Sequence, residues 1–411
     1  MSDARRVLVT GTFDVENYGD LLFPIVAAHE LGSRGFGVVP VSPTGAAVTG
    51  LADAPRPVTV AEMMSGEAPI AGILIGGGYI VHHHSASVLS EYESAGVADW
   101  AYAGLWLGAT AAAALRDVPV AWNAPGAPVP FGGAGRRALI GSMLRAATYV
   151  SVRDPGSLEF LGQHEGVDIR VVPDTVLGLA RAWPREALAD ACRTLAARKG
   201  ISAGTRWLAV HLRMRTLGQL QLADLARSID AIAARWEVTP LLIALGRSLD
   251  DAAAVSALSD TLRCGHVRLD DPTSLKEIAA AIAFSRAYVG ASMHGYVTAC
   301  AYDVPGVMVA RPAHRKFGGL VSQLGRRGDL AQDWTSALDA VERHMAATPS
   351  PRIPASVRMA LDQHWSEIGR ALEDTREAAE RRRRFLVDYL RSAIGGAGAA
   401  WAFQPFVSAR R

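Results

Sequence analysis

Cysteine and long hydrophobic runs are scarce in this chain, and each scarcity excludes a class of protein. The 411 residues include 3 cysteines, Cys192, Cys264 and Cys300, which are widely spaced and show no paired-thiol pattern for zinc or for a redox centre. No stretch reaches the roughly 18 consecutive apolar residues of a membrane-spanning helix. Because the first residues also lack the apolar segment of a secretory signal, we expect a cytoplasmic protein with reduced thiols.

An excess of either charge is also absent. The chain has 42 basic and 40 acidic residues and a formal net charge of +2. No strong field attracts nucleic acid, which is therefore not an expected partner. Lysine is rare among the basic residues and occurs as Lys199, Lys276 and Lys316. A lysine near a candidate site is thus a notable feature here.

Hydrophobic residues make up 50% of the chain, enough for two ordinary cores. Short β-branched runs bounded by glycine and proline alternate with helical patterns, which is typical of βαβ units and parallel sheets. We predict an α/β protein with two Rossmann-like doubly wound domains, residues 1–180 and 181–345. Strands are expected at 5–11, 36–41, 72–75, 118–122, 149–152 and 169–172, and then at 207–212, 240–245, 266–269, 287–290 and 306–309.

The C-terminal region, residues 346–411, is predicted to be a long helix followed by a tail. Apolar residues near helical spacing between 357 and 394 indicate a helix that packs back across both domains, and the arginine run 381–384 is interpreted as its solvated face. The tail carries Trp401 and Phe403. Docking on a neighbouring subunit, disorder and contact with a membrane surface are all compatible with it, and the first two are favoured.

Polar turns follow two predicted strands of the first half. Ligands of open α/β sheets bind beyond the carboxyl ends of the strands, where the segment 17–20 supplies Asn17, Gly19 and Asp20. Asn17 and Asp20 are candidates to bond a ligand hydroxyl, and Asp20 could act as a base or merely cap the next helix. The triplet 76–78, with Gly77 and Gly78, would let backbone amides approach an anion or a sugar; its spacing does not match a dinucleotide motif, so no nicotinamide cofactor is expected.

Three further segments of the first half carry candidate groups. His82, His83 and His84 are adjacent and point in different directions, so we predict a polar loop at the cleft rim and no metal site. Arg153, at a strand's carboxyl end, could reach an anion, whereas the neighbouring Asp154 is interpreted as a helix cap before Pro155. Asp174 follows the next strand and either braces the domain junction or contacts substrate.

In the second half, a strand leads into a basic turn. Alternation along an extended strand would place His211, Arg213 and Arg215 on one side, and arginine suits bidentate contact with phosphate or carboxylate.

A second signal is the segment Ser292-Met293-His294-Gly295, which follows a strand and begins a helix. Its free amides and the positive end of the helix dipole should face the cleft. His294 could donate to phosphate or move a proton near neutral pH. Lys316 lies beside His314 and Arg315 in a turn that either closes an anion site or is solvated.

Taken together, these motifs resemble the polysaccharide pyruvyl transferase family over about residues 5–325. The resemblance implies a GT-B-like arrangement of the two domains, phosphoenolpyruvate as donor substrate and a saccharide of a cell-envelope or exopolysaccharide precursor as acceptor. It implies a pyruvate ketal as product, release of phosphate and no cofactor. Many members carry Arg where this chain has Ser292. The matching segments are Asn17-Tyr18-Gly19-Asp20, Gly76-Gly77-Gly78, Ser151-Val152-Arg153-Asp154, Pro173-Asp174, Met293-His294-Gly295 with the following residues 299–305, and Lys316.

Such a reaction needs an acid and a base. We hypothesise that His294 binds the phosphate or delivers the proton, that Arg213 clamps the donor, and that Asp20 orients or deprotonates an acceptor hydroxyl. A GT-B glycosyltransferase that uses a nucleotide-sugar and a catalytically silent binding protein are the alternatives. Attachment of the acceptor to a lipid, peripheral membrane contact and a homo-oligomer stay open. The other predicted substrate-binding residues are Asn17, Gly19, Gly77, Gly78, Arg153, Asp174, Ser292 and Lys316.

Overall fold

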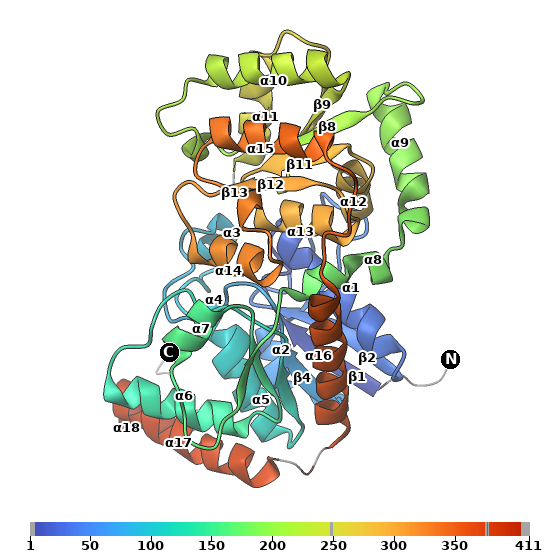
Figure 1. The fold of residues 1–411 in the computed structure, drawn as a ribbon. Helices are drawn as coiled ribbons and strands as arrows, with labels where there is room; N and C mark the ends of the chain where they lie inside the picture. The colour runs from blue at the N-terminus through green and yellow to red at the C-terminus, as the bar shows by residue number, and fades with distance from the viewer. Residues whose placement is uncertain (1–4, 247–249, 375, 377, 404–411) are drawn as a thin grey trace.

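The computed structural model describes residues 5–246, 250–374, 376 and 378–403, and it places two parallel β-sheets one above the other along the length of the molecule (Figure 1). The first sheet has the strand order β3-β2-β1-β4-β5, and the second has the order β10-β9-β8-β11-β12-β13. The predicted pair of doubly wound units is confirmed, whereas the boundaries at 180 and 345 stay a prediction.

The first sheet is buried on both faces. In β1, Val7 and Val9 enter one hydrophobic cluster with α1 and α16, while Leu8 enters the other with α2 and α5, as expected for a parallel sheet covered by helices. A parallel pair, β6 and β7, continues this sheet through a bridge between Ala121 and Tyr149. The elements are β1 Arg5–Thr10, α1 Tyr18–Gly32, β2 Phe36–Ser42, β3 Val58–Thr59, α2 Val60–Ser65, β4 Gly72–Ile75, α3 Ser90–Ser94, α4 Ala101–Ala103, the π-helical turn Gly104–Gly108, α5 Ala109–Leu115, β5 Val120–Trp122, α6 Ala134–Ala146, β6 Val150–Val152, α7 Pro155–Leu161 and β7 Ile169–Val171.

The second sheet alternates in the same way. In β8, Trp207 and Ala209 face the cluster that contains α12 and α13, while Leu208 and Val210 face α10 and α15. The linking elements are the 3-10 turns Thr175–Gly178 and Arg185–Leu188 with α8 Leu179–Ala182 and α9 Ala189–Lys199. The sheet and its helices are β8 Trp207–His211, α10 Leu222–Trp236, β9 Thr239–Ile243, α11 Asp251–Ser259, β10 Val267–Leu269, α12 Leu275–Ala283, β11 Ala287–Gly290, α13 Met293–Ala301, β12 Gly306–Val309, α14 Arg315–Gln323, β13 Leu330–Ala331 and α15 Trp334–Ala346, with 3-10 turns at Met214–Thr216 and Arg327–Asp329.

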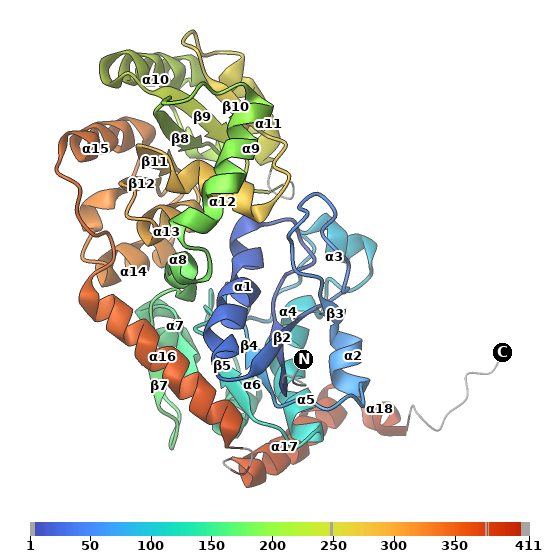
Figure 2. The same ribbon diagram turned by 90° about the vertical axis from the view of Figure 1, so that its right-hand side faces the viewer.

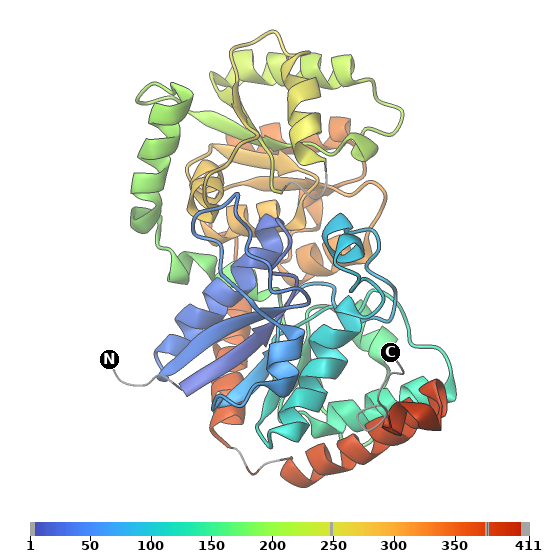
Figure 3. The ribbon, with the colours of Figure 1, turned by 180° about the vertical axis from the view of Figure 1, so that it is seen from behind.

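The predicted C-terminal helix is two helices and a short third one. α16, Ala355–Glu373, runs from the second half down to the first, where it packs on β5 and α1 (Figure 2). The chain then turns at Ala378, whose φ is 60°. α17, Ala379–Ala397, packs on α5 and α6, and α18, Ala399–Phe403, follows it at the lower edge of the molecule (Figure 3). Within the described ranges, no helix combines the length and apolarity needed to cross a bilayer.

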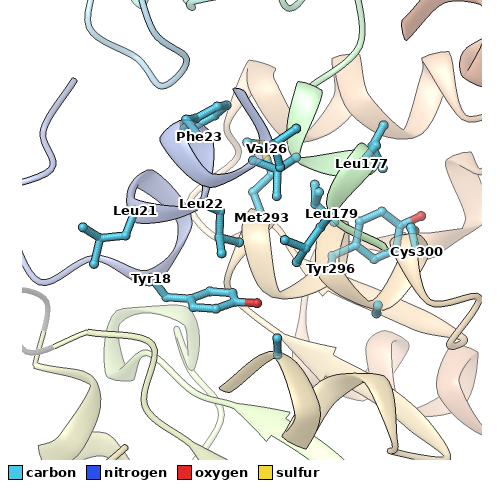
Figure 4. Close-up of a cluster of buried hydrophobic side chains, with 14 of the residues drawn as sticks. Tyr18, Leu21, Leu22, Phe23, Val26, Leu177, Leu179, Met293, Tyr296 and Cys300 are labelled. Carbon is cyan, nitrogen blue, oxygen red and sulfur yellow. The ribbon is translucent and has the colours of Figure 1, made fainter. Parts of the chain in front are cut away.

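The two halves share one hydrophobic core at the level of α1 and α13. Tyr18, Leu22 and Val26 of α1 lie close to Met293 and Tyr296 of α13 (Figure 4). The Tyr18 hydroxyl lies 3.0 Å from Thr298 Oγ1, and the Tyr18 N–H donates to the carbonyl oxygen of Leu245 at 2.9 Å. This packing sets the N-terminal ends of α1 and α13 side by side, and these are the ends to which the sequence assigns the candidate site.

Candidate active site

A cavity of about 170 Å³ lies where the carboxyl ends of strands from both sheets meet. This is the location at which open α/β sheets bind ligands. Eight residues predicted from the sequence line it, namely Asn17, Asp20, Gly78, Arg153, Arg213, Ser292, His294 and Lys316. The remaining lining residues are Thr12, Tyr79, Ile80, Tyr102, Ala291, Met293 and Phe317.

His294 lies in the first turn of α13, directly after β11, as predicted. Ser292 is the N-cap, and its Oγ accepts a hydrogen bond from the backbone N–H of Gly295 at 3.3 Å. The first turn of α13 therefore brings N–H groups and the positive end of the helix dipole to the cavity wall. A Cβ atom on Gly19 would lie 1.8 Å from His294 Nδ1, so Gly19 makes room for the imidazole and lies outside the lining.

Asp174 supports the opposite edge of the His294 ring. Its Oδ2 atom lies 3.5 Å from His294 Nε2 and 3.9 Å from Arg153 Nη1, and its side chain is 2% exposed. Burial opposes ionisation, but the contact with His294 and the charges of His294 and Arg153 hold the pKa of Asp174 below its ordinary value. The carboxylate contacts the imidazole from behind the cavity lining, so its position is that of a brace.

Arg153 presents a buried guanidinium to the same cavity. Its Cζ atom lies 3.9 Å from the centroid of the Tyr79 ring, and Nε lies 3.7 Å from Asp154 Oδ2. Within the described part of the chain, the Nε and Nη2 atoms have no hydrogen-bond partner. Buried donors without partners are costly, so an anion placed here would satisfy them. Asp154 caps α7, as predicted, because its Oδ1 accepts from the N–H of Ser157 at 2.8 Å.

Lys316 lies in the first turn of α14, and not in a loop. Its Nζ atom is 5.5 Å from the centroid of Tyr79. Burial, followed by the charge of Arg153, lowers the pKa of Lys316 to about 8, although Asp20 opposes this lowering. A bound anion would compensate the crowded positive charge and favour the ammonium form.

Asp20 forms the acidic wall. Its Oδ2 atom accepts hydrogen bonds from Asn17 Nδ2 at 2.8 Å and from the Thr12 hydroxyl at 3.0 Å. Asn17, and not Asp20, caps α1, because the Asn17 side chain accepts from the N–H of Gly19 at 3.3 Å. The capping alternative for Asp20 is therefore wrong, and the carboxylate is held at the cavity with its orientation fixed.

Arg213 reaches the cavity on the side of the second sheet. It is supported by the buried pair of His211 and Asp251, and the sequence did not predict the part played by Asp251. Asp251 Oδ1 lies 3.4 Å from Arg213 Nε, and Asp251 Oδ2 lies 2.9 Å from His211 Nε2. β8 ends at His211, so the predicted alternation does not continue, and Arg215 lies in a 3-10 turn outside the lining. Asp251 gave no signal because it lies 38 residues from Arg213 in a helix of ordinary composition.

Other predicted residues have supporting positions. A Cβ atom on Gly77 would lie 2.0 Å from the Phe23 ring, so Gly77 permits packing and does not line the cavity. His82 is buried, and its ring centroid lies 4.1 Å from that of Tyr102, which does line the cavity. Burial, and then the charges of His84 and His83, lower the pKa of His82 to about 4. In the described ranges, no cluster of three or more His, Cys, Asp or Glu residues is arranged to hold a metal ion.

The fold is a GT-B-like arrangement of two doubly wound units. UDP-GlcNAc 2-epimerase from Methanocaldococcus jannaschii is similar at a TM-score of 0.50 and 12% identity, over 86% of this chain and 97% of that chain. A putative UDP-N-acetylglucosamine 2-epimerase from Listeria monocytogenes is similar at a TM-score of 0.51 and 14% identity, over 90% and 98% of the two chains. At these identities the likeness concerns the fold alone, and it confirms the predicted GT-B-like arrangement.

The sequence model of one family, described as polysaccharide pyruvyl transferase, matches residues 17–312. This match spans more than half of the chain and includes most of the cavity lining, so the protein belongs to the polysaccharide pyruvyl transferase family. The predicted resemblance is confirmed, and the family is one of transferases. A search of curated proteins found no match.

Proposed function

We propose that this protein transfers the pyruvyl group of phosphoenolpyruvate to two hydroxyls of a saccharide, which forms a ketal and releases phosphate. The observation that carries the proposal is the composition of the cavity, because Arg153, Arg213 and Lys316 converge on the first turn of α13. Phosphoenolpyruvate has a phosphate and a carboxylate in one small molecule. Guanidinium groups bind both anions in bidentate fashion, and helix N-termini bind phosphate.

The size of the cavity favours the same donor. A cavity of about 170 Å³ is small, which suits phosphoenolpyruvate. A nucleotide-sugar is several times larger and needs a pocket closer to the range of roughly 300–1,000 Å³ that is common for ligands of that size. The small volume therefore supports a pyruvyl donor over a glycosyl donor.

The side chains supply an acid on one wall and a base on the other. Protonation of the donor's methylene carbon, by His294, leaves positive charge at C2, and an acceptor hydroxyl adds there as Asp20 takes its proton. The bond between C2 and the phosphate oxygen then breaks, and a second hydroxyl adds to C2. Two hydroxyl protons are lost, one is returned to the methylene-derived methyl group, and one leaves with the phosphate. Asp174 would stabilise the His294 imidazolium before each turnover.

Ser292 fits this assignment as a capping residue. Its side chain is used in the hydrogen bond to Gly295, so it supplies no cation at the position where many family members carry Arg. The positive charge at this wall comes from Arg213 and Lys316, which would take the role of the absent guanidinium.

The test of this proposal is phosphate release from phosphoenolpyruvate in the presence of a panel of saccharide acceptors. We expect His294→Gln to lower the rate by about 100- to 10,000-fold, the usual contribution of a general acid. His29→Gln, at an exposed position of α1, is the matched control and should leave the rate unchanged. Full activity of the His294 variant would remove the residue from the mechanism.

A thermal-shift comparison tests the donor without any acceptor. A ligand that binds the native state at 100 times its Kd raises the free energy of unfolding by about 2.7 kcal/mol, so phosphoenolpyruvate should raise the Tm. Stabilisation by UDP-sugars and not by phosphoenolpyruvate would support a glycosyltransferase instead. A response to neither would support a silent binding protein.

A further inference from the structure

The outer face of α17 and α18 has an apolar stripe that none of the described residues covers. Val387, Leu390 and Ile394 recur at three- and four-residue intervals and are 46%, 47% and 39% exposed, which places them on one side of α17. Trp401 and Phe403 continue the apolar character on α18 and are 39% and 61% exposed. Large apolar side chains gathered on one exposed helix face indicate a surface that contacts something else.

Arginines flank this stripe. α6 lies alongside α17 (Figure 1), and Arg381 Nε donates to the carbonyl oxygen of Arg145 at 2.7 Å. The two helices contain eight arginines and two acidic residues, although the whole chain has a formal net charge of +2. Arg383 and Arg384 are 71% and 76% exposed, and Arg391 is exposed on the side of the stripe. We call the stripe and the exposed arginines of α6 and α17 the α17 face.

We propose that the α17 face docks on a membrane surface that contains anionic phospholipids. A helix with apolar side chains on its outer side and arginines beside them lies in the interface of a bilayer, where the apolar groups enter the acyl boundary and the guanidiniums bind phosphate. Arginine also reaches the headgroups from a helix in this plane because its stem is long and apolar. The α17 face has both components, because its apolar side chains and its arginines are exposed.

Charge complementarity selects the membrane over other occupants. A second copy that paired through this face would bring both arginine clusters into one interface, where the added positive charge opposes association. A nucleic acid would bind the guanidiniums through its phosphates but would leave the apolar stripe in water. An anionic bilayer satisfies the charges and the stripe together.

The α17 face belongs to the same half as one rim of the cavity. Tyr102 lines the cavity and packs on His82, and the neighbouring His83 ring lies 5.6 Å from the Phe131 ring, just before α6 begins at Ala134. A saccharide carried on a lipid would approach the cavity along this side. That consequence rests on the proposed function, whereas the docking itself does not.

The test is co-sedimentation of the full chain with vesicles of phosphatidylcholine alone and of equal parts phosphatidylcholine and phosphatidylglycerol. We expect binding to the anionic vesicles and loss of binding as salt is added. Leu390→Ser combined with Ile394→Ser should weaken the partitioning by about tenfold or more, because two apolar side chains no longer leave water. Met359→Ser, at a 69% exposed position of α16, is the matched control and should bind normally.

A charge-reversal pair tests the arginines separately. Arg384→Glu combined with Arg391→Glu should abolish the preference for anionic vesicles, whereas Arg227→Glu combined with Arg235→Glu on α10, both 66% exposed, should retain it. Equal sedimentation with neutral and anionic vesicles would overturn the proposal. So would a dimer in light scattering that the Leu390 and Ile394 substitutions convert to a monomer. Phosphate release with a soluble saccharide reports the proposed function independently, because none of these positions lines the cavity.

Discussion

At the scale of single residues, Lys316 is the group whose role is easiest to isolate. It is one of three lysines in the chain, and it faces the cavity from α14. Loss of a charge-assisted hydrogen bond costs about 1.5–3 kcal/mol, so Lys316→Met should raise the KM for phosphoenolpyruvate by about 10- to 100-fold. Steady-state phosphate release measures this change. Lys199→Met is the control, because Lys199 pairs with Asp271 away from the cavity; an equal effect of both substitutions would contradict the assignment.

The pH dependence of donor binding follows from the same side chain. The pKa of Lys316 is lowered to about 8 by burial and by Arg153, so its ammonium group loses its proton as the pH rises through 8. The KM for phosphoenolpyruvate should therefore be lowest below pH 8 and should increase above it, by up to about tenfold for each pH unit. A profile measured from pH 6 to 10 checks the direction. A KM that is flat across this range would show that the charge of Lys316 does not contribute to donor binding.

At the scale of elements, the approach of α1 to α13 depends on Gly19. A Cβ atom there would overlap the His294 ring, whereas a Cβ atom on Gly32, at the other end of α1, would meet nothing within 4 Å. Gly19→Ala should displace His294 and lower kcat by at least about tenfold, because a general acid must lie within hydrogen-bond distance of the atom that it protonates. Gly32→Ala should keep the activity and gain up to about 1 kcal/mol of stability from helix propensity. Equal kcat values for the two variants would contradict this account of Gly19.

Elements with a strong local signal could be predicted from the sequence. β4, β11 and β12 begin and end where the pattern places them, because a buried parallel strand is a continuous apolar run between glycine and proline. β3 and β13 are absent from the prediction, since each has 2 residues. The single predicted C-terminal helix is divided, because Asp374 leaves the helical conformation after α16 and Ala378 adopts a left-handed backbone conformation before α17. The sequence pattern does not predict either change.

The residues of the candidate site likewise include some that the sequence predicts and some that it does not. Residues that follow strand ends, such as Asp20 and His294, could be found because topology brings the carboxyl ends of parallel strands together. The side chains that contact these residues from distant parts of the chain could not be predicted from the sequence. Asp251 contacts Arg213 from a distant helix, and Tyr79 meets both Arg153 and Lys316 although nothing in its local sequence distinguishes it from other tyrosines after a glycine turn.

At the scale of the whole molecule, α16 fastens the end of the chain to the first sheet through His364. Its Nε2 lies 3.0 Å from Asn123 Oδ1, and its Nδ1 lies 2.9 Å from the Tyr149 hydroxyl. Burial lowers the pKa of His364 from 6.5 to about 3. The His364 side chain therefore binds a proton below about pH 6.5 in the unfolded chain, but only below about pH 3 in the folded chain.

This difference predicts a loss of stability in acid. Between pH 6.5 and about 3, His364 should reduce the free energy of unfolding by up to about 1.4 kcal/mol per pH unit, and it should have no such effect above pH 6.5. Denaturant titrations of the native chain and of His364→Gln measure it, and the stability advantage of the native chain should narrow as the pH falls. The exposed His29→Gln supplies the baseline. A constant difference between the native and His364→Gln proteins across this range would mean that His364 is not buried as a neutral base.

Because lysine is scarce, chemical labelling of Lys316 can report whether the donor site is occupied. Near pH 8 about half of the Lys316 amines are uncharged and nucleophilic, so a small amine-directed reagent that enters the cavity should acylate them. Phosphoenolpyruvate should protect this position and leave the labelling of Lys199 and Lys276 unchanged. Peptide mass spectrometry would then read occupancy of the donor site from a single modified residue, before any acceptor is supplied.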